Sequence, residues 1–124
     1  MYTDDYSWAA NNPEQYTVSK AVTNDVAQYK QYTTDLYNIK ADKYNNGETI
    51  SGSRKEKVVN YVNNLNLDYG AKLILFKSEY PSDDTYNADI INYINNRNDL
   101  TYEERVTIYT ELGFTVKDGY VYWD

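Results

Sequence analysis

Apolar residues return at intervals of three and four positions over most of the chain, and short polar stretches separate these runs. This spacing is typical of amphipathic helices. The first run predicts one long helix that begins at Asn12-Pro13, a capping residue followed by proline, and ends between Lys40 and Lys43. Asp25 interrupts its apolar stripe, which comprises Val18, Val22, Val26, Tyr29, Tyr32, Leu36 and Ile39.

This first stripe approximates the heptad pattern of a coiled coil, but it is short of the three or four uninterrupted heptads that a coiled coil requires. We therefore expect the long helix to pack on its own domain. Formation of a homo-oligomer through the same stripe is the alternative.

Four shorter helices are predicted between residues 53 and 113. Ser53 and Thr101 each stand three positions before a glutamate, which is the capping-box pattern that opens a helix. Asp68 is a cap for the second of the four helices, and Pro81 ends that helix. The residues predicted to face inward are Val58, Val59, Val62 and Leu65, then Tyr69, Leu73, Phe76 and Tyr80, then Tyr86, Ile90, Ile91 and Ile94, and finally Val106, Tyr109 and Leu112.

These four helices contain an internal repeat. The run VVNYVNNL, which starts at Val58, matches IINYINNR, which starts at Ile90. After one inserted residue the match continues, with Tyr69, Lys72, Leu73, Leu75 and Phe76 corresponding to Tyr102, Arg105, Val106, Ile108 and Tyr109. The segment is thus predicted to be two copies of a helical hairpin that pack on each other.

The chain closes with FTVKDGYVYW, in which Asp118-Gly119 favours a type I′ turn between two strands. This β-hairpin places Val116 opposite Val121 and Phe114 opposite Trp123, so we expect these side chains to cover the helices and Trp123 to fill the core. The sequence therefore predicts a single, mainly all-α domain. It consists of an N-terminal segment and long helix over residues 1–43, a turn over 44–52, duplicated hairpins over 53–113 and a β-hairpin over 114–124.

Composition narrows the function. The chain has 124 residues and a net charge of -7, a sign that disfavours binding to nucleic acid or to an anionic membrane surface. It lacks cysteine and histidine, which removes the commonest nucleophilic, general-base and metal-binding side chains. The acidic N-terminus does not resemble a signal peptide, and no apolar run is long enough to span a bilayer, so we expect the chain to be cytoplasmic when it is synthesised.

Tyrosine is unusually frequent, with 16 residues. Tyrosine is enriched in protein interfaces, which favours a contact surface rich in this residue. A bias toward AT-rich codons, or tyrosines buried at core positions, would give the same count.

The stretch DKYNNGETISGS resembles a calcium-binding loop in part. Asp42, Asn46 and Gly47 occupy the first ligand position, the third ligand position and the glycine position of an EF-hand loop. Tyr44 and Ser53 stand where an acidic or amide ligand and the bidentate glutamate are required. Asp42 and Asn46 are thus the only metal-ligand candidates, and a turn that leads to a capping serine is the favoured interpretation; a calcium-stabilised binding module built on the loop over 42–53 remains the alternative.

No catalytic residues and no cofactor are predicted. The acidic pairs Asp83-Asp84 and Glu103-Glu104 have the composition of an acid/base pair, but each stands at a predicted helix N-terminus, where negative charge is stabilising. Glu111 has no basic or nucleophilic neighbour in the sequence. The domain is therefore predicted not to be an enzyme; an accessory domain of a phage lysis or processing enzyme is the second alternative.

Several segments together resemble a known family. They are NPEQY, QYTTDLYNIKADK, ISGSRKEKVVNYVNNL, FKSEYPSDDTYN and ELGFTV before YVYW, and ISGSRKEKV and FKSEYPSDDTYN are the most specific of them. The order is similar to the C-terminal region of large virion-associated proteins, of tape-measure, internal or ejected type, from bacteriophages and prophages of Firmicutes. The resemblance implies a non-catalytic structural or protein-interaction module that resides in the virion and binds other parts of a larger phage protein or particle.

Overall fold

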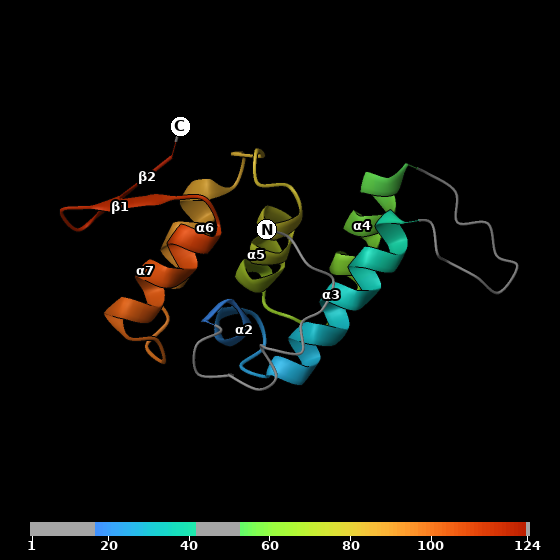
Figure 1. Ribbon diagram of the computed structural model, residues 1–124, viewed down its shortest axis with the longest axis horizontal. Helices are drawn as coiled ribbons and strands as arrows, with labels where there is room; N and C mark the ends of the chain where they lie inside the picture. Colours follow the sequence, from blue (N-terminus) through green and yellow to red (C-terminus); the bar gives the residue numbers. More distant parts are fainter. Residues whose placement is uncertain (1–16, 42–52, 124) are drawn as a thin grey trace, which may run out of the picture.

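The computed structural model describes residues 17–41 and 53–123 (Figure 1). The described chain is mainly helical and ends in a small antiparallel β-hairpin, which confirms the predicted fold class. The Asn12-Pro13 start of the first helix, the turn over 44–52 and the metal-ligand candidates Asp42 and Asn46 lie outside the described residues. The elements are α2 (Thr17–Val22), α3 (Val26–Lys40), α4 (Arg54–Asn63), α5 (Tyr69–Glu79), α6 (Asn87–Asn95), α7 (Tyr102–Glu111), β1 (Thr115–Lys117) and β2 (Tyr120–Tyr122).

The predicted long N-terminal helix is interrupted, because α2 ends at Val22 and α3 begins at Val26. Asn24 adopts a positive φ of 57°, which ends the first helix. Asp25 then caps the second, since its carboxylate accepts hydrogen bonds from the amides of Ala27 (2.9 Å) and Gln28 (3.2 Å). The prediction of one continuous helix was therefore wrong: Asp25, taken as a gap in the apolar stripe, is a helix start.

The apolar stripe of the two N-terminal helices lies inside the domain, as expected. Val18 and Val22 of α2 and Tyr32, Leu36 and Ile39 of α3 are all buried. Helix α3 packs along α4, while α2 contacts both α5 and α7. The face that would have formed a coiled coil is thus covered by the chain itself.

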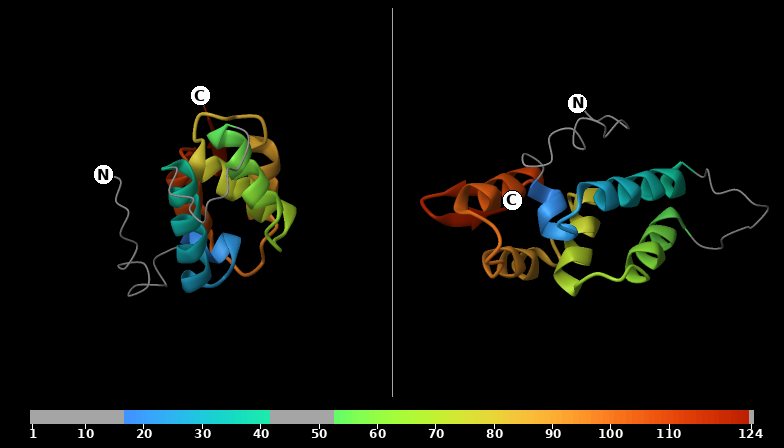
Figure 2. Two further views of the ribbon diagram at one scale, coloured as in Figure 1. Left: turned by 90° about the vertical axis from the view of Figure 1, so that its right-hand side faces the viewer. Right: turned by 90° about the horizontal axis from the view of Figure 1, so that it is seen from below.

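The two predicted helical hairpins are α4 with α5 and α6 with α7. Matched residues lie at matched positions of their helices: Tyr69 begins α5 and Tyr102 begins α7. Helix α5 contacts α2, α4 and α6, so it is the central helix of the molecule (Figures 1 and 2). Its Leu73, Ile74 and Leu75 are buried, as the apolar run in its sequence predicts.

Each hairpin holds one N-terminal helix through the same repeat position, occupied by Tyr61 in the first copy and Tyr93 in the second. The Tyr61 hydroxyl donates to the Asp35 carboxylate of α3 (2.7 Å). The Tyr93 hydroxyl lies 3.4 Å from the carbonyl oxygen of Ala21 in α2. Helices α2 and α3 are therefore bound to the two copies in a corresponding way.

Arg97 strengthens the attachment of α2. Its guanidinium donates to the carbonyl oxygens of Lys20 (3.1 Å) and Ala21 (2.7 Å), to the Tyr93 hydroxyl (2.7 Å) and to the Asp99 carboxylate. The last carbonyls of a helix have no partner within the helix, and a cation suits their partial negative charge. A side chain from the connection between α6 and α7 thus closes the C-terminal end of α2.

Both predicted capping boxes open helices, but only the second is complete. The Thr101 side chain accepts from the Glu104 amide, and the Glu104 side chain accepts from the Thr101 amide. The Ser53 hydroxyl accepts from the Glu56 amide (3.2 Å). Asp68 precedes α5 as predicted, yet its side chain makes no capping hydrogen bond there.

The C-terminal hairpin has the predicted turn and register. Asp118 and Gly119 have positive φ angles of 54° and 81°, and Val116 pairs with Val121. Phe114 is buried, but 45% of Trp123 is exposed, so the prediction that Trp123 fills the core was wrong. Its ring meets the edge of Phe114 at a centroid distance of 6.2 Å, which places it over the core rather than inside it.

No helix in residues 17–41 and 53–123 combines the length and the apolarity needed to cross a bilayer.

Candidate functional site

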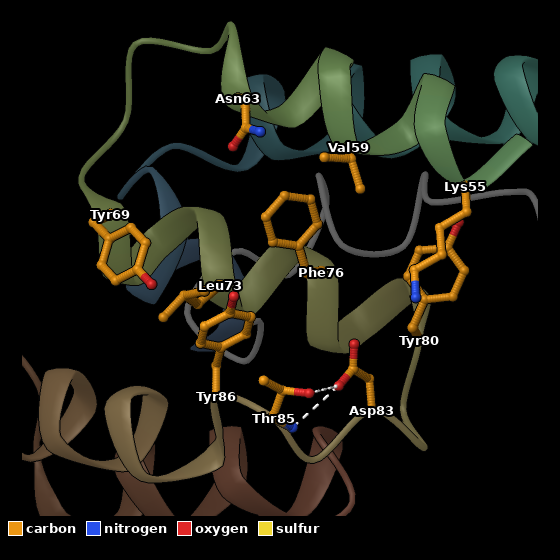
Figure 3. Close-up of a pocket in the computed structure, with 10 residues that line it drawn as sticks. All are labelled: Lys55, Val59, Asn63, Tyr69, Leu73, Phe76, Tyr80, Asp83, Thr85 and Tyr86. Atoms are coloured by element: carbon orange, nitrogen blue, oxygen red, sulfur yellow. Dashed lines mark hydrogen bonds between the residues drawn. The ribbon is translucent and has the colours of Figure 1, made fainter. Parts of the chain in front are cut away.

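A groove of about 390 Å³ lies between α4, α5 and the connection from α5 to α6 (Figure 3). Its floor is apolar, and tyrosine side chains stand at both ends. This size and this combination of an apolar floor with a few polar groups are typical of binding sites. The lining residues are Lys55, Val59, Asn63, Tyr69, Leu73, Phe76, Tyr80, Asp83, Thr85 and Tyr86.

Helical spacing places these side chains along the groove. On α4 the lining residues recur every fourth position, from Lys55 through Val59 to Asn63. On α5 they recur at intervals of three and four, from Tyr69 through Leu73 to Phe76, and Tyr80 follows as the C-cap residue. Residues at such intervals share one face of a helix, so each helix presents a continuous wall.

A buried lysine fixes the loop that closes one end of the groove. Lys77, only 5% exposed, donates to the Asp83 carbonyl (3.0 Å) and to the Asp84 carboxylate (3.1 Å). The Asp84 carboxylate also accepts from the Asn87 carboxamide (3.0 Å). Since these bonds join the end of α5 to the start of α6, the loop carrying Thr85 has a defined position.

This end of the groove carries two opposite charges. The Lys55 ammonium lies 5.4 Å from the centroid of the Tyr80 ring, a cation–π contact. The Asp83 carboxylate accepts from the hydroxyl (2.7 Å) and the amide (3.1 Å) of Thr85. These hydrogen bonds, assisted by the charges of Lys55 and Lys77, lower the pKa of Asp83, so the carboxylate is negative at neutral pH.

In the second hairpin, a tyrosine of the hairpin itself occupies the position that corresponds to the groove. Tyr109 corresponds to Phe76, and its hydroxyl approaches the carbonyl oxygen of Ile91 (3.1 Å) and the carboxamide oxygen of Asn95 (2.5 Å). Burial raises the pKa of Tyr109 to about 12, so the hydroxyl keeps its proton and remains a donor. Asn63 corresponds to Asn95, but Phe76 has no hydroxyl to offer it.

The two copies also differ in how far other residues cover the matched aromatic ring. Tyr109 is buried, and its ring meets the edge of Phe114 at a centroid distance of 6.0 Å. Phe76 is half-buried and contributes to the groove. The first hairpin therefore presents an open aromatic surface where the second hairpin is closed by its own tyrosine and by the C-terminal segment.

Only the second acidic pair opens a helix as predicted, since Glu103 and Glu104 lie in the first turn of α7. Helix α6 begins at Asn87 after the N-cap Tyr86, so the prediction that Asp83 and Asp84 cap it was wrong, and their side chains bind other groups instead. Asp83 binds Thr85, and Asp84 binds Lys77 and Asn87. Glu104 belongs to the capping box and forms an ion pair with Lys20. Of the described residues that line the groove, Asp83 is the one carboxylate, so the groove does not have the two facing carboxylates that would support the alternative of an accessory domain of a phage lysis or processing enzyme.

Glu111 has the most perturbed carboxyl group of the described residues. Desolvation raises its pKa to about 7, although the residue as a whole stays more than one-third exposed. It does not line the groove, and the described part of the chain contains no cluster of three acidic side chains that could hold a metal ion. A single such carboxyl does not make an acid/base pair.

Sequence reasoning identified most lining residues but assigned them to the core. Val59, Tyr69, Phe76, Tyr80 and Tyr86 were predicted to face inward, whereas Tyr69 is 64% and Tyr86 44% exposed. A signal for the groove was present in the sequence: the first copy has Phe76 where the second copy has Tyr109, so the first copy lacks the hydroxyl donor at this position.

No family model, curated protein or solved structure matches the chain.

Proposed function

We propose that the chain is a non-catalytic protein-interaction module of a virion-associated phage or prophage protein, and that the groove between α4 and α5 is its binding surface. The observation that carries the binding role is the difference between the two copies. One hairpin is closed by Tyr109, while the other offers Val59, Phe76 and exposed tyrosines to a partner.

The chemistry of the groove supports a protein partner. Aromatic side chains contribute large contact areas and are enriched at the energetic centres of protein interfaces. Tyr69 and Tyr86 combine such area with hydroxyl groups, and both are exposed. The net charge of -7 argues for a protein rather than a phosphate-bearing partner.

The phage context rests on the sequence resemblance, and the coding context tests it. We expect the reading frame to continue upstream into a large protein encoded among phage tail genes. A short isolated frame outside any phage or prophage would overturn this part of the proposal.

Site-specific photocrosslinking tests the groove. A photoreactive phenylalanine analogue replaces Tyr69 in one variant and Tyr102 in the other, and crosslinks are mapped in purified particles. Tyr69 and Tyr102 are matched positions, 64% and 61% exposed, but only Tyr69 lines the groove. We expect crosslinks to a defined segment of a virion protein from position 69 and not from position 102; equal yields from both positions would contradict the proposal.

A further inference from the structure

The C-terminal hairpin presents a second aromatic surface, which lies apart from the groove. Tyr120 is 67% and Tyr122 52% exposed, and their ring centroids are 6.5 Å apart. Both side chains share the outer face of the hairpin with Lys117, which pairs with Tyr120 in the strand register. Tyrosine is enriched in protein interfaces, which makes this pair a candidate contact surface.

The hairpin and the groove carry complementary groups. The hairpin offers two tyrosine rings beside adjacent positive and negative charges, Lys117 and Asp118. The groove offers an apolar floor beside a negative and a positive charge, Asp83 and Lys55. Lys117 can therefore face Asp83 while Asp118 faces Lys55, with the rings over the floor.

The hairpin cannot enter the groove of its own chain. It projects from the end of the molecule that α7 occupies, whereas α4 lies at the opposite end (Figures 1 and 2). Only the hairpin of another molecule can reach the groove.

We propose that the occupant of the groove is a second copy of this chain, which inserts the outer face of its C-terminal hairpin, with Tyr120 and Tyr122, between α4 and α5. This inference rests on the proposed role of the groove as the binding surface. The contact joins two different surfaces, so it is head-to-tail and lets copies add in series.

The size of the contact sets its strength. Each inserted tyrosine buries roughly 150–250 Å², so two rings fall well below the roughly 1,200 Å² of a stable interface. The contact is therefore weak between free molecules and effective where many copies lie side by side, as in a particle. The net charge of -7 on each copy adds repulsion, which salt screens.

Sedimentation of the 124-residue chain over a range of concentrations tests the inference. We expect the weight-average sedimentation coefficient to rise with concentration, and Tyr69→Ala in the groove or Tyr120→Ala in the hairpin to weaken association about tenfold. Tyr102→Ala is the matched control, and it should associate like the unmodified chain. Circular dichroism checks that each variant is folded.

Mixing two defective variants gives the decisive result. Tyr69→Ala retains a working hairpin and Tyr120→Ala a working groove, so an equimolar mixture should form heterodimers at concentrations where each variant alone is monomeric. Failure of the mixture to dimerise, or a monomeric unmodified chain at millimolar concentration, overturns the inference. If position 69 still crosslinks to a different virion protein, the proposed function stands and only the identity of the occupant changes.

Discussion

Phe76 and Tyr109 occupy the same position of the two helical hairpins, and the Tyr109 hydroxyl reaches across to Ile91 and Asn95 while Phe76 ends in a bare ring. The Tyr109 hydroxyl, together with the cover from Phe114, thus distinguishes the closed copy from the open one. Because the matched residues Val59 and Asn63 both line the groove, the frame that could receive such a hydroxyl is still present in the first copy.

Removal of the Tyr109 hydroxyl should destabilise the domain. In Tyr109→Phe the Asn95 carboxamide and the Ile91 carbonyl lose a donor, at an expected cost of about 1–2 kcal/mol in the free energy of unfolding. Urea denaturation measures this cost. Tyr102→Phe, at an exposed position of the same helix, is the control and should leave the free energy of unfolding unchanged.

The reverse exchange should close the groove. In Phe76→Tyr we expect the new hydroxyl to bind Asn63 as Tyr109 binds Asn95, which adds up to about 1 kcal/mol of stability. Association measured by sedimentation should weaken at the same time, because the hydroxyl occupies space that a partner needs. Greater stability with unchanged association would show that the groove is not the contact surface.

Gly70 permits the close approach of Tyr93. A Cβ atom at position 70 would lie 2.2 Å from the Tyr93 ring, too close for any side chain. Gly70→Ala should therefore lower the free energy of unfolding by about 1–3 kcal/mol, in spite of the better helix propensity of alanine. Thermal and urea denaturation measure the loss.

A double-mutant cycle separates this clash from a general effect of the substitution. With Tyr93→Ala already present, the cost of Gly70→Ala should vanish or change sign, since the ring that obstructs the methyl group is gone. Additive costs would contradict the clash as the cause.

Acid should weaken the attachment of α2. The hydrogen bond from Lys20 lowers the pKa of Glu104, and that from Arg97 lowers the pKa of Asp99, relative to ordinary values of 4.5 and 3.8. A carboxyl whose pKa is lower in the folded state than in the unfolded state stabilises the fold at pH values above its unfolded pKa. This contribution is lost as the pH falls through its folded pKa. Urea denaturation between pH 6 and pH 2 should therefore show stability falling mainly below about pH 4.5.

A conservative variant isolates the charge of Glu104. Glu104→Gln keeps an acceptor for the Thr101 amide but loses the ion pair with Lys20, so it should lower stability at pH 6 by about 1 kcal/mol or less and flatten the acid dependence. Glu103→Gln at the neighbouring exposed position is the control. Equal effects of both substitutions would argue against a specific role for the ion pair.

Local signals in the sequence predicted the helices and the final turn well, because caps and turns depend on neighbouring residues. Thr101 with Glu104 and Asp118 with Gly119 behave as their types require. The same logic should have found the break before α3, since Asp25 is a capping residue. The apolar stripe across it was given more weight, and that choice hid the helix start.

The groove could not be predicted in this way, because an apolar residue on a helix looks the same whether another element covers it or not. Val58 and Val59 are adjacent and chemically identical, yet Val58 is fully buried and Val59 lines the groove. Only the packing of α3 on one side of α4 decides between them. The sequence feature that pointed to an uncovered surface was the difference between the two copies at Phe76 and Tyr109.

Helices α2 and α3 are both bound by tyrosines that come later in the chain, and this has a consequence for folding during synthesis. Both helices leave the ribosome before the hairpins that bind them, so the tyrosine contacts of α3 and α2 form only after Tyr61 and Tyr93 have been translated. Helix α3 can dock as soon as α4 is complete, whereas α2 has partners in both copies, α5 and α7. The covering of α2 is therefore complete only when Arg97 and α7 have been translated, near the end of the described chain.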